Sequence, residues 1–454
     1  MDFSDACSGR RKKKILFITA GLAVCFLVVG LRLALACSSP TSFGYVYDFY
    51  HEPILMYYET GEIPDSDDCW QCYHPPVYTL FGEWVFSAGM ALSGGAKGVA
   101  QAGVAFSSVF ISFVFISFAW LIVRHYVKHR GRRLLMLFML LSLPCLFISS
   151  FSIESDLLCA TFILIAFYFF LRYRQTETRG WLHVLVMGVA AGMAIGTKYS
   201  GIIILMVLSL LFFVAFLQDR KPKFIVHLTA LLALSLLIGG WRYLDNVRTE
   251  GRLFVGNEAW RHVDGQNRKF YFKEYEFHTF RLRELVSLMK PESPQKELKH
   301  FDVYNYSVLT SLFGQIWTDC SIFSNPSRHG LRKGLYPEKS IPISLVAALL
   351  CVGIVPVLLG GVGMIGSICR AKHVPLLVLS GISILVYTRW FLAHPEWALK
   401  TKYLFQIIPA GLVFCSFGLA SLGRRSEYAE KIAVGALILL VVLANAYNFF
   451  FAIT

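Results

Sequence analysis

Long apolar runs recur along the whole chain and restrict it to a membrane fold. They extend from Ile15 to the C-terminus, and each is about 17 to 25 residues long, enough to cross about 30 Å of hydrocarbon. Such runs form helices, whereas a membrane barrel would show alternating segments of about ten residues. Hydrophobic residues make up 56% and charged residues 16% of the 454 positions. We therefore predict an all-α multi-pass membrane protein.

The first apolar run, Ile15 to Ala36, follows a basic stretch from Arg10 to Lys14. At about 22 residues it is longer than the apolar core of a secretory signal, so we predict a retained anchor with a cytoplasmic N-terminus. The net charge of +14 is spread between the apolar runs. This is the distribution of cytoplasmic loops, and we expect no nucleic-acid partner.

The segment from Pro75 to Gly95 decides the topology. It is about long enough to span but contains Glu83 and several small residues. If it is an interfacial helix in the first outer loop, the very basic segment from Arg124 to Arg133 becomes cytoplasmic, as do the other basic loops. This threading predicts about eleven transmembrane helices. Their approximate ranges are 15–36, 100–123, 134–150, 157–171, 181–197, 200–217, 224–243, 342–366, 374–392, 403–421 and 432–451.

Four parts of the chain follow from this threading. Residues 1–14 form a basic cytoplasmic N-terminus, and 15–243 form an N-terminal transmembrane module whose first outer loop, 37–99, carries catalytic residues. Residues 244–341 form one large extracytoplasmic loop, longer than a linker needs to be. Residues 342–454 form the C-terminal transmembrane helices.

Cys69 and Cys72 lie in "CWQC" within the first outer loop. No second cysteine pair follows at a zinc-like interval. A loop disulfide in an oxidising compartment is the favoured interpretation, with free thiols and redox or metal chemistry as alternatives.

Charged residues from distant parts of the chain gather at the outer turns. A cluster of charges beside a helical bundle indicates a polar substrate, because charges are costly to bury there. Lysine and arginine hold phosphate by charge-assisted hydrogen bonds, and a carboxylate can act as a general base. The candidate acids are Asp48, Glu154 and Asp156, and the candidate phosphate ligands are His74, Lys198, Arg242, Lys400, Lys402 and Tyr403.

Structural roles remain open for these residues. Asp48 is a good residue to cap a helix, His74 can shape the turn before Pro75, and lysines near helix ends often extend toward the lipid headgroups. Lysines at an outer face, however, oppose the usual charge bias of membrane loops. At least one of Lys400 and Lys402 is therefore expected to serve a phosphate.

Several short motifs resemble the GT-C superfamily of polyprenyl-phosphate-sugar-dependent glycosyltransferases. They are "HPPVYTL" before the interfacial helix, "SIESDLL" in the second outer loop, "GMAIGTKYSG", and "KTKYLFQIIPA" at the start of a late span. The last is like the K/R-x-R/K-Y pattern of the branch with protein O-mannosyltransferases and bacterial aminoarabinose transferases. An acidic residue early in the first outer loop completes the order of motifs.

The resemblance implies roles for two residues. The first-loop acid, which activates or orients the acceptor nucleophile in that superfamily, matches Asp48. The residue before the Pro-Pro pair, which contacts the donor phosphate region, matches His74, although aminoarabinose transferases carry lysine there. The resemblance also implies inversion at the anomeric carbon and a large loop that caps the acceptor site.

We therefore predict an inverting glycosyltransferase that moves a hexosyl or pentosyl group from a polyprenyl-phosphate donor to a hydroxyl of a lipid, glycan or protein at the extracytoplasmic face. A glycan ligase or polymerase with another lipid-linked donor is the alternative, followed by a transporter or a non-catalytic assembly subunit. No metal site is evident in the sequence, and use of a divalent cation stays open. Short loops favour a bacterial plasma membrane over the endoplasmic reticulum with a lumenal active site.

Overall fold

The computed structural model describes residues 29–34, 50–176, 180–256, 280, 308–318, 342–393 and 401–453. All regular structure in these ranges is helical, with no strand. Eight helices are long and apolar enough to cross a membrane, and the bent pair α10 and α11 makes a ninth crossing if it counts as one. The predicted all-α multi-pass architecture is confirmed, but the predicted count of about eleven crossings is not.

The eight candidate spans lie within α4 (Lys97–Tyr126), α7 (Ser155–Tyr173), α8 (Gly180–Thr197), α9 (Ile202–Asp219) with the 3-10 helix η1 (Tyr199–Gly201), α17 (Ile343–Ile365), α18 (Val374–Ala393) with η4 (Ala371–His373), α19 (Ile408–Arg425) with η5 (Thr401–Ile407), and α20 (Glu427–Ile453). The shorter helices are α2 (His51–Thr60), α3 (Val77–Leu92), α5 (Arg130–Ser142), α6 (Pro144–Ser149), α10 (Lys223–Gly239), α11 (Trp241–Glu250) and α15 (Val308–Trp317).

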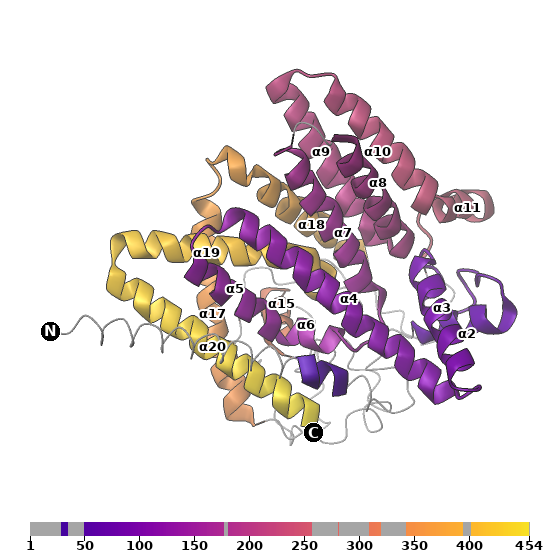
Figure 1. The fold of residues 1–454 in the computed structure, drawn as a ribbon, viewed down its shortest axis with the longest axis horizontal. Helices are drawn as coiled ribbons and strands as arrows, with labels where there is room; N and C mark the ends of the chain where they lie inside the picture. The colour runs from indigo at the N-terminus through magenta and orange to yellow at the C-terminus, as the bar shows by residue number, and fades with distance from the viewer. Residues whose placement is uncertain are drawn as a thin grey trace, which may run out of the picture.

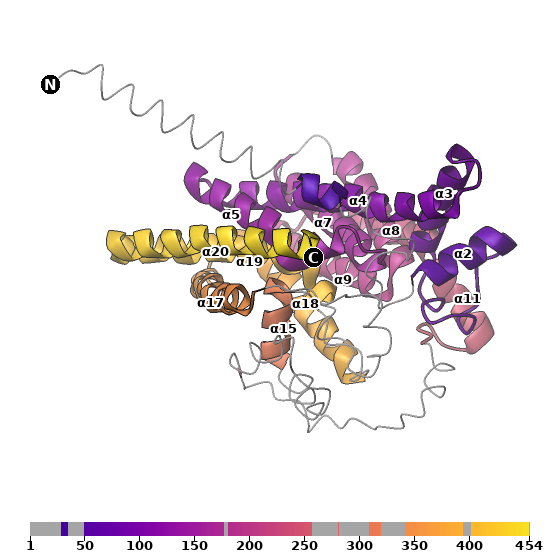
Figure 2. The same ribbon diagram turned by 90° about the horizontal axis from the view of Figure 1, so that it is seen from below.

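Helix α4 holds the two sides of the molecule together. Helices α7 to α10 lie on one side and α17, α19 and α20 on the other, and α4 packs against both α7 and α19 (Figure 1). The short helices α2, α3 and α11 lie toward one end of the molecule, away from the turn between α19 and α20 (Figures 1 and 2). The C-terminal ends of α4 and α7 lie close together, because the shorter helices α5 and α6 return the chain between these two spans.

The predicted span over residues 134–150 is wrong as a single helix. Helix α5 ends at Ser142, and α6 starts with Pro144 in its first turn. Proline has no N–H and its ring clashes with the preceding turn, so the helix breaks there. Two asparagines of α20 satisfy the polar groups at the break: Asn448 Nδ2 donates to the Ser142 carbonyl at 3.1 Å, and Asn445 Nδ2 donates to Ser142 Oγ at 2.7 Å.

The predicted span over 224–243 ends early, because α10 stops at Gly239 and α11 leaves at an angle of 62°. Gly239 packs directly on the backbone of Gly192 and Gly196 in α8, where no Cβ would fit. Helix α11 exposes Trp241, Leu244 and Val247, the apolar face of an amphipathic helix. This arrangement is typical of a helix that lies in a membrane interface.

The predicted interfacial helix of the first outer loop is α3, which has 16 residues and is shorter than the candidate spans. Gly82 of α3 contacts Ile54 of α2, and Gly89 contacts Ala100 of α4. Small residues therefore let α3 lie close against two helices.

The glycine-rich "GGVGMIG" at 360–366 lies within α17 and its junction with the next turn, where small residues let helices pack closely. Gly363 of α17 lies against the backbone of Phe414 and Gly418 in α19, with no room for a Cβ. Most of the first predicted helix and most of the large loop at 244–341 lie outside the described residues, so the predicted domain boundaries stay predictions.

Candidate functional site

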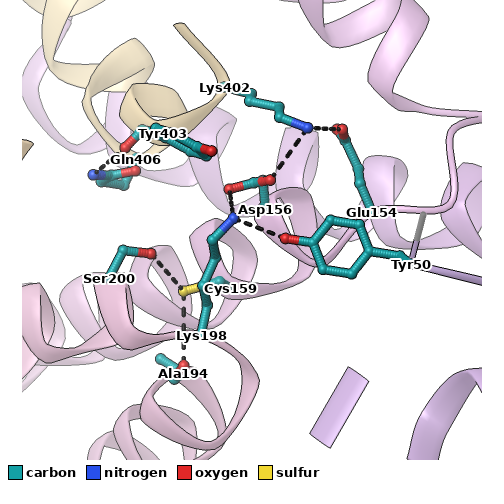
Figure 3. Close-up of polar contacts among 10 residues, drawn as sticks. All are labelled: Tyr50, Glu154, Asp156, Cys159, Ala194, Lys198, Ser200, Lys402, Tyr403 and Gln406. Atoms are coloured by element: carbon teal, nitrogen blue, oxygen red, sulfur yellow. Dashed lines mark hydrogen bonds and ion pairs between the residues drawn. The ribbon is translucent and has the colours of Figure 1, made fainter. Parts of the chain in front are cut away.

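Four charged side chains meet where several helices begin or end at one face (Figure 3). Lys198 Nζ lies 2.6 Å from Asp156 Oδ1, and Lys402 Nζ lies 2.9 Å from Glu154 Oε2 and 3.5 Å from Asp156 Oδ2. Asp156 therefore links the two lysines into one ion network. The sequence predicted each residue as a site candidate, and the fold brings all four together.

Helix ends place these side chains. Glu154 has extended backbone directly before α7, and Asp156 lies in the first turn of that helix, where a carboxylate is favoured by the helix dipole. Lys198 occupies the extended residue between α8 and the 3-10 helix η1. Lys402 lies in η5, just before α19.

The network is buried and electrically balanced. The exposed side-chain fractions are 2% for Asp156, 7% for Lys198, 8% for Glu154 and 9% for Lys402. Charges are buried at acceptable cost only when they are paired. Two lysines and two carboxylates give zero net charge, so an incoming anion competes with the carboxylates for the lysines.

Burial and pairing act in opposite directions on the pKa values. Burial alone lowers the pKa of Lys198, but the nearby Asp156 carboxylate together with Tyr403 and Tyr73 outweighs burial, and the pKa is raised. Burial raises the pKa of Glu154 above its ordinary value, although the Lys402 ammonium opposes this shift. Lys198 therefore stays protonated at neutral pH, and Glu154 gains a proton more readily than an exposed glutamate.

Tyr50 joins the first outer loop to the network and was missed by sequence reasoning. Lys198 Nζ donates a hydrogen bond of 3.0 Å to its hydroxyl (Figure 3). The Tyr50 ring stacks on His74 with 5.8 Å between centroids. Only its position two residues after Asp48 could have singled it out.

His74 is buried among aromatic rings. Its ring lies 4.0 Å from Tyr73 and 6.0 Å from Tyr199, measured between centroids. The Tyr199 hydroxyl donates to the Tyr73 carbonyl at 2.8 Å. A disulfide joins Cys69 and Cys72 directly before this segment.

A cavity of about 660 Å³ opens beside the network. Its polar wall contains Lys198 and the aromatic residues Tyr73, His74, Tyr199 and Tyr403. Its apolar wall comes from α9 and α18, through Ile202, Ile203, Met206, Leu385, Val386 and Trp390.

Two basic groups, Lys198 and Arg389, line this cavity. The Lys198 ammonium lies 4.6 Å from the centre of the Tyr403 ring. Arg389, an exposed residue in the last turns of α18, also lines the cavity. Sequence reasoning missed Arg389 because it reads as an ordinary cation near the end of an apolar run.

The other predicted residues lie elsewhere. Arg242 is buried, but it bonds Asp245 Oδ2 at 3.2 Å and the Pro64 carbonyl at 3.3 Å and does not line the cavity. Asp48 and Lys400 lie outside the described residues. Within the described ranges, no group of three or more histidine, cysteine, aspartate or glutamate residues lies close enough to hold a metal ion.

Residues 73–241 match the sequence model of the dolichyl-phosphate-mannose-protein mannosyltransferase family. The matched part is less than half of the 454-residue chain and contains His74, Glu154, Asp156 and Lys198. No curated protein matches the sequence.

Two solved structures share the fold. The archaeal oligosaccharyltransferase AglB from Archaeoglobus fulgidus, in complex with an inhibitory peptide and a dolichol-phosphate, has a TM-score of 0.50 and 13% identity; the match covers 94% of this chain and 56% of that chain. ArnT from Cupriavidus metallidurans, bound to undecaprenyl phosphate, has a TM-score of 0.50 and 14% identity. This match covers 97% of this chain and 75% of the ArnT chain. The chain thus spans little more than half the length of AglB. The resemblance to the GT-C superfamily is confirmed.

Proposed function

We propose that this protein is a membrane glycosyltransferase that moves a sugar from a polyprenyl-phosphate donor to an acceptor hydroxyl. One observation carries the proposal: Lys198 lies where the ion network meets a cavity with an apolar wall. A lipid-linked phosphate needs both properties, a cation for its head and apolar surface for its chain. The family match over residues 73–241 supports the same donor class.

The donor phosphate would bind beside Lys198. Its oxygens would accept hydrogen bonds from the Lys198 ammonium in competition with Asp156, while Arg389 at the cavity wall adds a second cation. Charge-assisted bonds of this kind are about twice as strong as neutral ones. The first isoprene units would lie against Ile203 and Met206 of α9 and Trp390 of α18.

The reaction is a direct displacement at the anomeric carbon. The acceptor oxygen forms a bond to that carbon, the bond from the carbon to the phosphate oxygen breaks, and the electron pair leaves with the polyprenyl phosphate. Asp48 takes the hydroxyl proton as general base. The single displacement inverts the anomeric centre.

The ion network supports this step electrostatically. Negative charge grows on the leaving phosphate in the transition state, and a fixed cation in a site poor in water stabilises it strongly. Lys198 supplies that cation, and Lys402 keeps Glu154 and Asp156 compensated while Lys198 turns toward the donor. Lys400 remains a predicted phosphate ligand, whereas Arg242 bonds Asp245 and the Pro64 carbonyl and has no part in this scheme. A hexosyl or pentosyl donor is equally compatible with this scheme.

The test is a donor panel. Purified protein is incubated with radiolabelled polyprenyl-phosphate sugars, and donor binding and release of lipid phosphate are measured for wild type, Asp48→Asn, Lys198→Gln and the control Arg248→Gln. Arg248 is an exposed cation of α11 away from the cavity.

The expected result is loss of turnover with binding retained in Asp48→Asn, and loss of donor binding in Lys198→Gln. The Arg248 control should match wild type. Absence of donor binding in every variant, including wild type, would overturn the proposal and favour transport or assembly.

A further inference from the structure

A second cavity, of about 300 Å³, lies at the other ends of the helices that form the first. The first cavity touches α9 near Ile203 and α18 near Trp390, and the second touches α9 near Gln218 and α18 at Val374. From Ile203 to Gln218 a helix rises about 22 Å. The two cavities therefore lie near opposite faces of the membrane, along the same pair of packed helices.

The polar wall of the second cavity is basic. It contains His125 at the end of α4, Arg174 after α7, and Lys372 before α18. Arg174 is compensated, because its Nη1 lies 2.9 Å from Asp219 Oδ2. Lys372 is exposed and has no hydrogen bond or ion pair with another described residue. The cavity thus keeps an uncompensated positive charge at its rim.

Its surroundings add to this charge. Arg172 and Arg370 are both exposed, and each is adjacent in sequence to a residue that lines the cavity. The wall also includes Val374 and Pro375, in the first turn of α18. The amides of Gln175 and Gln218 offer further donors. The chemistry of the polar wall therefore suits a phosphate group.

The rest of the wall is apolar. Leu211, Val214 and Ala215 of α9 line it on the side that continues along the helix into the membrane. A free phosphate ion gains nothing from such a surface, whereas the chain of a lipid does. A cationic rim beside an apolar wall favours a ligand that has both an anionic headgroup and an apolar chain.

We propose that this cavity binds the phosphate headgroup of an anionic membrane lipid. The phosphate contacts Lys372 and His125, accepts bonds from the glutamine amides, and its acyl chain lies along α9. The site is separate from the donor cavity, and the inference does not rest on the proposed glycosyltransferase activity.

Native mass spectrometry of the full chain tests the proposal directly. The protein is titrated with phosphatidylglycerol and with phosphatidylcholine, and bound lipid is counted for wild type, Lys372→Gln, Lys372→Arg, and the double variant His125→Gln/Lys372→Gln. The control is Lys431→Gln, an exposed lysine in the first turns of α20 that causes the same change in net charge.

Phosphatidylglycerol should bind wild type more tightly than phosphatidylcholine does. Lys372→Gln should weaken phosphatidylglycerol about fivefold, the factor that corresponds to about 1 kcal/mol for one basic side chain near an anionic surface. The double variant should lose more, and Lys431→Gln and Lys372→Arg should bind as wild type does. Thermal midpoints measured alongside establish that every variant is folded.

Two results would overturn the proposal. One is equal loss in Lys372→Gln and Lys431→Gln, which would mean that only the overall charge matters. The other is displacement of the lipid by millimolar inorganic phosphate in wild type, which would make this a site for soluble anions.

Discussion

Lys198 and Asp156 form a buried ion pair, and replacing one of the two residues costs more free energy of unfolding than replacing both. Removing one partner leaves the other charge buried without compensation, at a cost of about 3–5 kcal/mol, whereas replacing both with apolar groups avoids that cost. Lys198→Met should therefore destabilise the protein by about this amount. The double variant Lys198→Met/Asp156→Leu should lose much less than the sum of the single losses.

Equilibrium unfolding in mixed micelles measures this cycle. The matched control is the exposed pair of Lys431 with Glu427, for which both single and double changes should be small. Additive losses at Lys198 and Asp156 would contradict the coupling drawn from their contact.

Glu154 gives the fold a pH dependence. Burial raises its folded pKa above the ordinary 4.5, with Lys402 opposing the shift. Between 4.5 and the folded pKa, the folded chain holds a proton that the unfolded chain has released, so the free energy of unfolding falls as pH rises. Glu154→Gln removes the titrating group. Its thermal midpoint should therefore fall less than that of wild type as pH rises through this window.

The control for this pH series is Glu83→Gln, a partly exposed glutamate of α3 that accepts a hydrogen bond from Ser87. It should follow the wild-type curve. A Glu154→Gln curve parallel to wild type would mean that Glu154 has the same pKa in the folded and unfolded chain.

At this scale the sequence predicts residue types better than partners. Outer lysines were identifiable because they oppose the usual charge bias of membrane loops, and the acids because charges beside a helical bundle are costly to bury. The pairing of Lys402 with Glu154 was not, because it depends on how distant helices pack. Tyr50 was missed because it is one of 21 tyrosines, and a hydroxyl near Lys198 has no sequence signature.

Helix α17 depends on Gly363 for its contact with α19. A Cβ at this position would collide with the carbonyl of Phe414. Gly363→Ala should destabilise the protein by about 1–3 kcal/mol, the usual cost of overpacking. Gly361→Ala is the matched control, because nothing lies within 4 Å of its Cβ position and alanine favours a helix. Thermal unfolding should order the variants as Gly361→Ala, wild type and Gly363→Ala, from most to least stable.

The Cys69–Cys72 disulfide lies directly before Tyr73 and His74, which line the cavity proposed to bind the donor. Its closed loop is very short, so it contributes less to global stability than a long-range disulfide. Cys69→Ser/Cys72→Ser should raise the donor KM about threefold or more, with kcat nearly unchanged, because only positioning is lost. Reducing the wild type should reproduce this effect, and reducing the double variant should change nothing. A fall in kcat at constant KM would contradict a positioning role.

The element scale also shows where hydropathy misleads. Residues 134–150 are mostly apolar and uncharged, so their hydropathy predicts one span, yet Pro144 divides them. The proline was visible in the sequence, but prolines also occur inside spans, as Pro356 does in α17. What decides the outcome is the pair of asparagines on α20 that satisfies the broken turn, and only the packed structure reveals it.

The whole molecule has an uneven distribution of charge. The ion network lies at one face, and the basic turns near Lys128, Lys372 and Arg424 lie at the other. The positive-inside rule therefore predicts that the network faces away from the cytoplasm. In intact cells or sealed right-side-out vesicles, an impermeant thiol reagent should label the Lys97→Cys variant more than the parent protein. It should not label the Lys128→Cys variant. The opposite pattern would invert the topology.

The ion network also sets an order for biogenesis. Lys402 follows its partner Glu154 by 248 residues, and Lys198 follows Asp156 by 42. During synthesis, Lys198 therefore becomes available early to compensate Asp156. Glu154 has no lysine partner until Lys402 has been synthesised, near the end of the chain. A ribosome stalled before η5 leaves an inserted bundle in which Glu154 has no lysine partner. Such a bundle holds a carboxylate at the membrane boundary that no ammonium compensates.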